Sequence, residues 1–187
     1  MCKTIRLRFV GVSEIVGTDD LALMLLADEQ CERQISIVCS RDMAIQLDMR
    51  VNKLPITRRM LPEVLYGILS RQEDLRFHIL INDISDGQYD SMLVNSKTQE
   101  MMPIRISDAV LLSLAGDVPI FIDEKLMAHQ SVVYREPTGE MKIPLPINTM
   151  SLEMIEQAIE RAVKEENYEQ AALLSEERKR RMSGLGN

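Results

Sequence analysis

Three short apolar runs near the start of the chain constrain its fold most. In residues 5–10, Ile5, Leu7 and Phe9 alternate with Arg6, Arg8 and Val10, and two further apolar runs occupy residues 21–26 and 34–39. Turn-forming residues separate them, at 17–20 and 28–30. Short strands at such close spacing are typical of an antiparallel meander. The first forty residues therefore predict three adjacent antiparallel strands.

Helical and strand patterns then alternate. Ser40-Arg41-Asp42 predicts a helix start, and the apolar positions of residues 57–69 recur at helical spacing, which predicts an amphipathic helix packed on a sheet or helix beneath it. Asp86-Gly87 predicts a tight hairpin, and Ser107 is a suitable N-cap for a buried helix that Gly116 ends. Further strands are predicted at 75–84, 88–94, 104–106 and 118–122, and further helices at 107–115 and 123–130. The fold class expected is α+β, with an antiparallel or mixed sheet and packed helices.

The pattern changes after residue 135. Prolines and glycines interrupt residues 136–149, as in a linker, and Ser151 then opens a new helical pattern that a second one follows at 168–182. Ile155 and Ile159 mark the apolar stripe of the first of these helices, on which Tyr168 and Leu174 are expected to pack. The sequence predicts a domain over residues 1–135, a linker over 136–149 and a small helical hairpin over 150–184.

Charge and cysteine content narrow the class of protein. Twenty-two Lys and Arg stand against 29 Asp and Glu, a net charge of -7, which argues against nonspecific coating of nucleic acid but leaves a local basic groove open. The basic run 178–181 is interpreted as cations that favour a helix C-terminus. Cys2, Cys31 and Cys39 form no CxxC pair, and no apolar run approaches 20 residues. These features predict free thiols and a cytoplasmic location.

Acidic and basic residues suited to phosphate chemistry gather in two places. Asp83, Asp86 and Asp90 surround the predicted hairpin, and Arg105 and Asp108 stand where a strand gives way to a helix. Carboxylates can hold Mg²⁺ or Mn²⁺, and a guanidinium can neutralise charge on a phosphoryl group. The same residues also suit a turn and a helix start, so a purely structural reading stays open. His78 is interpreted as a satisfied or surface strand residue.

The two clusters carry a resemblance to a known family. Residues 82–93, the run Ile104-Arg105-Ile106-Ser107-Asp108-Ala109 and residues 119–122 resemble the bacterial and plant bifunctional nuclease (BFN) family, over about residues 5–130. The resemblance implies an α+β domain with DNase and RNase activity. It implies Asp83, Asp86 and Asp108 as catalytic residues and Arg105 and Ser107 as substrate-binding residues. A histidine common in the family before the second helix is absent from residues 54–60.

The tail carries a second resemblance. Residues 162–177, with the core Glu166-Asn167-Tyr168-Glu169-Gln170-Ala171-Ala172, resemble the UVR motif, the helical hairpin of nucleotide excision repair proteins. Ser175-Glu176 replaces the usual Arg-Asp. The resemblance implies a protein partner bound through four residues: Tyr168, Glu169, Ala172 and Leu174.

Two functions therefore remain open. The first is a nuclease that cleaves DNA or RNA with a divalent metal, Mg²⁺ or Mn²⁺, and contacts a protein through its tail. The second is a non-enzymatic interaction or regulatory protein that keeps the fold, which the acidic net charge and the lack of a histidine or lysine base favour. A homo-oligomer is expected in both cases, because edge strands need protection and 13 Met supply adaptable apolar surface.

Overall fold

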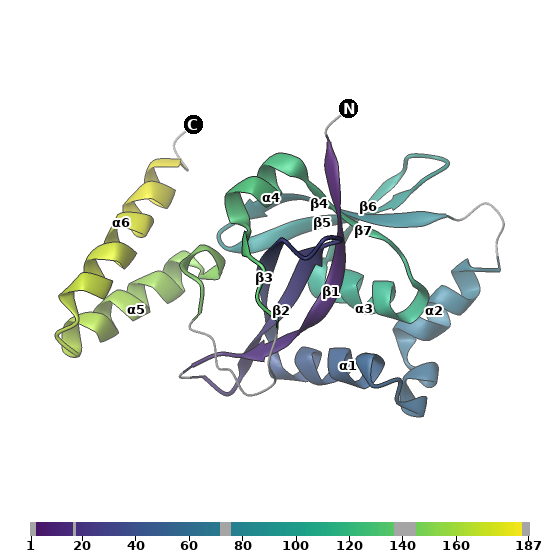
Figure 1. Ribbon diagram of the computed structural model, residues 1–187, viewed down its shortest axis with the longest axis horizontal. Helices are drawn as coiled ribbons and strands as arrows, with labels where there is room; N and C mark the ends of the chain where they lie inside the picture. The colour runs from purple at the N-terminus through teal and green to yellow at the C-terminus, as the bar shows by residue number, and fades with distance from the viewer. Residues whose placement is uncertain (1–2, 17, 72–75, 137–144, 185–187) are drawn as a thin grey trace. The chain divides into compact units, whose positions relative to one another are not determined.

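The computed structural model describes residues 3–16, 18–71, 76–136 and 145–184, which form one large sheet, its helices and a C-terminal helical pair (Figure 1). The strands are β1 (Thr4–Glu14), β2 (Leu21–Asp28), β3 (Arg33–Ser40), β4 (Phe77–Ser85), β5 (Gln88–Asn95), β6 (Met101–Arg105), β7 (Ile120–Asp123) and β8 (Val132–Val133). The helices are α1 (Arg41–Val51), α2 (Leu61–Leu69), α3 (Ile106–Gly116), α4 (Glu124–Gln130), α5 (Leu152–Lys164) and α6 (Tyr168–Gly184), with 3₁₀ turns η1 (Pro55–Arg59) and η2 (Ile147–Thr149).

Contacts divide the chain into two compact units. Met1–Ser85 and Tyr89–Pro144 form the first unit, and Asp86–Gln88 with Leu145–Asn187 form the second. No described helix is long and apolar enough to cross a bilayer. Each unit is considered by itself below.

The sheet of the first unit is mixed, as the sequence predicts. Its strand order is β6-β5-β4-β7-β1-β2-β3-β8, and β1, β2 and β3 pair antiparallel in sequence order, which confirms the meander. The β4 and β7 strands pair in parallel. Nearly every side chain of β2 is buried, because the strand lies inside the sheet and is covered on both faces. The α+β fold class is therefore confirmed.

Local signals place several helices correctly. Ser40 caps α1, since its hydroxyl accepts a hydrogen bond from the Met43 N–H, and Asp123 caps α4 by accepting from the N–H groups of Lys125 and Leu126. Each of these caps depends on residues adjacent in sequence.

Cys31 and Cys39 are free thiols, as predicted, and burial raises the pKa of the Cys39 thiol to about 11.

The helix predicted over residues 57–69 is divided in the structure. Residues 55–59 form the 3₁₀ turn η1, and α2 begins only at Leu61. Pro62 explains the break, because proline has no N–H for a continuous helix but is well accepted in a first turn. A helix does lie beneath this segment, since α2 contacts α3, but four side chains of the predicted apolar stripe are exposed: Leu61, Val64, Leu65 and Ile68.

Both ends of α3 differ from the prediction. The helix begins at Ile106 with Arg105 in the N-cap position, so Ser107 lies in the first turn and is not the cap. At the other end Gly116 is the last residue of the helix, and Asp117, with φ 53°, follows it in the left-handed conformation common after a helix. Gly116 is needed for another reason: a β-carbon built there would lie 2.0 Å from the ring of Tyr66 on α2.

In the second unit, α5 and α6 pack as a pair around a small apolar core. Met150, Ile155 and Leu174 are buried together, and the Ser151 hydroxyl accepts from the Met154 N–H at the start of α5. Leu174 thus packs as predicted. Tyr168 does not, because 68% of its surface is exposed.

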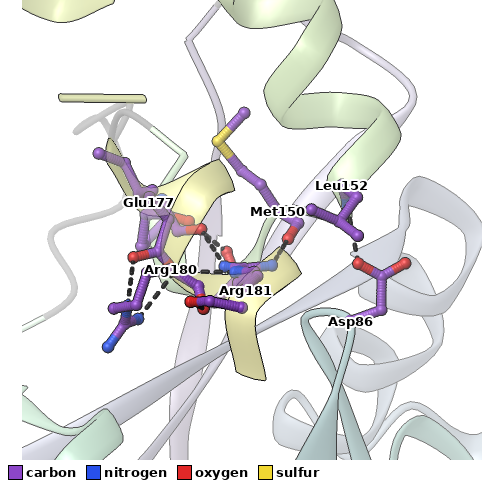
Figure 2. Close-up of polar contacts among 10 residues, drawn as sticks. Asp86, Met150, Leu152, Glu177, Arg180 and Arg181 are labelled. Atoms are coloured by element: carbon purple, nitrogen blue, oxygen red, sulfur yellow. Dashed lines mark hydrogen bonds and ion pairs between the residues drawn. The ribbon is translucent and has the colours of Figure 1, made fainter. Parts of the chain in front are cut away.

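Two arginines of the basic run near the end of α6 make hydrogen bonds within this unit (Figure 2). Arg180 and Arg181 both donate to Glu177, and hydrogen bonds from these two arginines lower the pKa of that carboxyl although its burial acts to raise it. Arg181 also donates to the carbonyl oxygens of Ile147 and Met150, which fixes η2 to α6. These contacts support the structural interpretation of the run.

Asp86 and Gly87 belong to this second unit by their contacts. The Leu152 N–H, in the first turn of α5, donates to Asp86 Oδ1 at 2.8 Å (Figure 2). A carboxylate there satisfies a free backbone donor and suits the positive end of the helix dipole. Gly87, with φ 76°, has the carbonyl oxygens of Thr149 and Met150 within 2.9 Å of where a β-carbon would stand. Backbone contact at this point requires glycine.

Replacing Gly116 tests the contact between α3 and α2. Gly116→Ala should lower the free energy of unfolding by about 1–3 kcal/mol, because the added methyl group displaces the Tyr66 ring. Gly67→Ala in α2 is the matched control: nothing lies within 4 Å of its β-carbon position, so helix propensity should leave it neutral or up to about 1 kcal/mol more stable. Denaturant unfolding measures both, and equal effects would contradict the proposed contact.

Replacing Asp86 tests its bond to α5. Asp86→Ala should raise hydrogen exchange at the Leu152 amide roughly fivefold, as expected for a lost cap of about 1 kcal/mol. Asp86→Asn keeps an acceptor oxygen and tolerates the left-handed φ of 48°, so it should exchange nearly as slowly as the native chain. Unchanged exchange in the alanine variant would show that the bond does not form.

Candidate functional site

A charged pair stands where β6 gives way to α3. Arg105 Nε donates to Asp108 Oδ2 at 2.7 Å, and this hydrogen bond raises the pKa of Arg105. The side chains are 79% and 37% exposed, so both can meet a solute. Asp108 lies in the first turn of α3, where the helix dipole favours its negative charge. The pair is therefore fixed in place by the start of a buried helix and open to water.

Asp90 joins this pair from the neighbouring strand. It lies directly opposite Arg105 in the antiparallel β5–β6 ladder, so the two side chains leave the sheet on the same face. Asp90 is exposed. The sequence analysis placed Asp90 beside the predicted hairpin and assigned it no role. The residues around Asp90 do not specify the register of β5 against β6, and it is this register that sets Asp90 opposite Arg105.

The other predicted site residues lie in different surroundings. Asp83 is exposed on β4, where its Oδ1 accepts from the Ile84 N–H, and β4 is two strands from β6, about 10 Å across the sheet. Ser107 is half-buried in the first turn of α3. Asp86 belongs to the second unit and accepts the hydrogen bond from α5. Of the predicted residues, the structure thus joins Arg105 with Asp108 by a direct contact.

The carboxylates do not form a ready metal cage. Among the residues that the structure describes, no three of the types His, Cys, Asp and Glu lie close enough together to hold a metal ion. Mg²⁺ is often held by one or two carboxylates, with substrate phosphates and waters as the remaining ligands. Asp108 fits a Mg²⁺ site of this kind, in which the substrate and solvent supply most of the ligands.

A basic pocket at the other end of α3 was missed by the sequence analysis. Arg50 lies buried in an ion pair with Glu63, Nε to Oε1 at 2.9 Å and Nη2 to Oε2 at 2.9 Å. Lys53 and Arg58 are exposed and line the same cavity of about 180 Å³ with Thr57. The cavity thus carries an excess of positive charge. No periodic pattern links Arg50 to Glu63, thirteen residues away beyond η1.

His78 has the structural surroundings that the sequence suggests. Its Nδ1 lies 3.0 Å from Ser96 Oγ, and its ring meets the Phe121 ring edge-on at 5.8 Å between centroids. These contacts agree with a satisfied strand histidine.

The residues predicted to bind a partner divide into exposed and buried ones. Tyr168, Glu169 and Ala172 are exposed on α6, whereas Leu174 is 2% exposed and belongs to the core of the helical pair. Beside them Leu173 and Glu176 help line an open groove of about 700 Å³ that also includes Ile147 and Arg180. The groove lies wholly within the second unit.

A protein-family model matches a large part of the chain. The family model described as bifunctional nuclease domain matches residues 24–135, which is more than half of the chain and includes Arg105, Asp108 and the basic pocket. The match ends before α5, so the likeness of the tail to the UVR motif stays a prediction. No curated protein matches the chain. By the region matched, the chain belongs to the bifunctional nuclease domain family.

Proposed function

We propose that this protein is a nuclease that hydrolyses phosphodiester bonds of DNA or RNA at the Arg105–Asp108 pair. The observation that carries the proposal is this solvent-open cation and carboxylate, fixed by the start of α3 inside the region that matches the nuclease family. The pair contains the two charge types that phosphoryl chemistry requires.

Each residue has a distinct task in this proposal. Arg105 gives its Nε to Asp108, so its two Nη groups face phosphate oxygens and neutralise the charge that develops there. Asp108 accepts a proton from the attacking water, whose oxygen bonds to phosphorus as the phosphorus–oxygen ester bond breaks, and the leaving oxygen takes up a proton from solvent. Ser107 contributes a hydroxyl to the substrate, and Asp90 and Asp83 continue the acidic side of the site across the sheet. Asp86, with its bond to α5, is assigned a structural role in place of a catalytic one.

We also propose that Mg²⁺ or Mn²⁺ enters this site together with the substrate. A divalent ion would supply positive charge at the phosphate and lower the pKa of bound water. Asp108 is the carboxylate best placed to hold it.

The basic pocket gives the acidic chain a local attraction for nucleic acid. Lys53 and Arg58 form no ion pair among the described residues, while the charge of Arg50 is balanced by Glu63. The pocket lies beside Leu114 and Ala115, about 10 Å along α3 from Asp108 at a rise of 1.5 Å per residue. Two cations at this distance support contact with the phosphate backbone away from the cleaved bond.

A second candidate is a regulatory or interaction protein that keeps the fold without cleavage. Two observations favour it: the net charge is -7, and no three His, Cys, Asp or Glu side chains among the described residues lie close enough together to hold a metal ion. The exposed Tyr168, Glu169 and Ala172 and the groove beside them are the surface we propose for a protein partner in either case.

Cleavage assays with the purified chain test the nuclease. Single-stranded and duplex DNA and RNA should be cut with Mg²⁺ or Mn²⁺ present and spared with EDTA. Arg105→Ala and Asp108→Asn should each lower kcat about 10²–10³-fold, the usual loss when one preorganised charge is removed from a transition state.

The control for these variants is another exposed ion pair. Arg6 and Glu29 are 3.3 Å apart and about half exposed on the same unit, so Arg6→Ala should leave cleavage unchanged. If the native chain cuts no faster than Asp108→Asn under every condition, the nuclease proposal is wrong and the interaction protein remains.

A further inference from the structure

A pocket with aromatic walls lies on the first unit. Its lining includes two of the chain's three phenylalanines, Phe77 and Phe121, together with His78, Leu80 and Ser96, and its volume is about 400 Å³. Pockets of roughly 300–1,000 Å³ are typical of sites for small molecules and cofactors. We call this cavity the Phe121 pocket. The Arg105–Asp108 pair does not account for it.

The strands place the Phe121 pocket on the face of the sheet opposite the main core. Leu80 lies opposite Phe121 in the parallel β4–β7 ladder, so these two side chains leave the sheet on the same face. The isoleucines that alternate with them are buried in the core on the other face: Ile79, Ile81, Ile120 and Ile122. Leu80 and Phe121 are only half-buried, so this apolar surface stays open to a ligand.

Two rings meet in the Phe121 pocket at nearly a right angle. The His78 and Phe121 rings have an interplanar angle of 84°, with 5.8 Å between their centroids. A planar ligand that stacks on one of these rings therefore presents its edge to the other, and both arrangements are favourable for aromatic rings. This corner suits a flat aromatic group such as a nucleobase.

The polar groups of the pocket also suit a nucleobase. His78 Nδ1 lies 3.0 Å from Ser96 Oγ, which holds the imidazole in place. The other ring nitrogen, Nε2, bonds to no residue that the structure describes, so it is left for a ligand. The edge of a base carries both donors and acceptors, and an imidazole nitrogen or a hydroxyl group can meet either.

The surroundings of the Phe121 pocket are positively charged. Three exposed cations each stand next to a lining residue in the sequence: Lys3, Arg76 and Lys97. No lining residue is acidic, and the carboxylate of Asp123, opposite Thr4 in the β1–β7 ladder, is engaged by the first turn of α4. A chain of net charge -7 thus has cations around this pocket, as the phosphates beside a bound base require.

The Phe121 pocket and Arg105 share one face of the sheet. Ile104 packs in the same core as Ile79 and Ile81. Because side chains alternate along a strand, Arg105 leaves the sheet on the same face as Leu80. The β4 strand is two strands from β6, about 10 Å across the sheet. A strand with one base in the pocket can therefore continue over this face toward Arg105.

We propose that the Phe121 pocket binds an unpaired base of the nucleic acid substrate, so that single strands bind in preference to duplexes. This inference rests on the proposed function and adds the class of substrate to it. A base inside a duplex loses its pairing and stacking before it can enter the pocket. Every base has a π face, so the pocket requires no particular sequence.

Fluorescence anisotropy in EDTA tests binding without cleavage. The probes are a labelled thymidine strand of about 12 nucleotides, within the range of known single-strand sites, and its duplex with a complementary strand. At one salt concentration the native chain should bind the strand at least about 10-fold more tightly than the duplex. An abasic strand of the same length keeps the phosphates and should also bind at least about 10-fold more weakly than the thymidine strand.

Variants of Phe121 separate stacking from simple packing. Phe121→Ala should weaken binding of the thymidine strand about 10-fold, as when one base–aromatic stack is lost. Phe121→Leu keeps an apolar side chain but has no π face, so it should weaken binding about fivefold or more, whereas Phe121→Tyr should stay within about twofold of the native chain. Circular dichroism of each variant establishes that it is folded.

The control variant is Val132→Ala. Val132 is apolar, 54% exposed and on β8 of the same sheet, outside the pocket, so its replacement should leave the affinity for the thymidine strand unchanged.

Three results would overturn the proposal: equal affinity for strand and duplex, equal affinity for the abasic and thymidine strands, or native affinity in Phe121→Leu. Failure of the nuclease proposal is a separate outcome, because it would appear as Phe121-dependent binding of single strands that the native chain does not cut. Failure of the pocket alone would appear as cleavage that requires Asp108 while Phe121→Leu binds strands as the native chain does.

Discussion

The burial of α3 is the constraint on which the rest of the first unit depends. Its residues 109–112 lie in the core, so both ends of the helix are fixed. The first turn holds Asp108 against Arg105, and the last turn offers the bare α-carbon of Gly116 to Tyr66. The Tyr66 contact in turn sets which side of α2 faces water. One packed helix thus determines both a charged site at its start and an apolar surface beyond its end.

Local patterns were enough to predict much of this fold. The meander, the Asp86-Gly87 hairpin and the caps at Ser40 and Ser151 each depend on a few adjacent residues, so the sequence contains the whole signal. Periodicity also found α2, but it could not show the direction in which the stripe points. That direction depends on Tyr66 and Gly116, fifty residues apart, and on the Arg50–Glu63 ion pair.

The candidate site was predictable to a similar degree. The sequence placed Arg105 and Asp108 together where a strand gives way to a helix, and the structure shows a direct contact between them. Asp86 was grouped with them through the family resemblance, yet its carboxylate accepts a hydrogen bond from the N–H of Leu152, 66 residues later. The basic pocket was not predicted because residues of four separate elements, α1, η1, α2 and α3, form it. The residue types alone indicated phosphate chemistry. Contacts between parts of the chain that are distant in sequence determine which of these side chains lie together.

Gly87 carries a consequence for comparing chains of this family. A tight turn with positive φ accepts asparagine as well as glycine, so the hairpin alone would allow either residue. The carbonyl oxygens of Thr149 and Met150 remove that freedom, since even a β-carbon would collide with them. We therefore expect glycine at the corresponding position of a chain that makes the same backbone contact, because the turn alone would also accept asparagine.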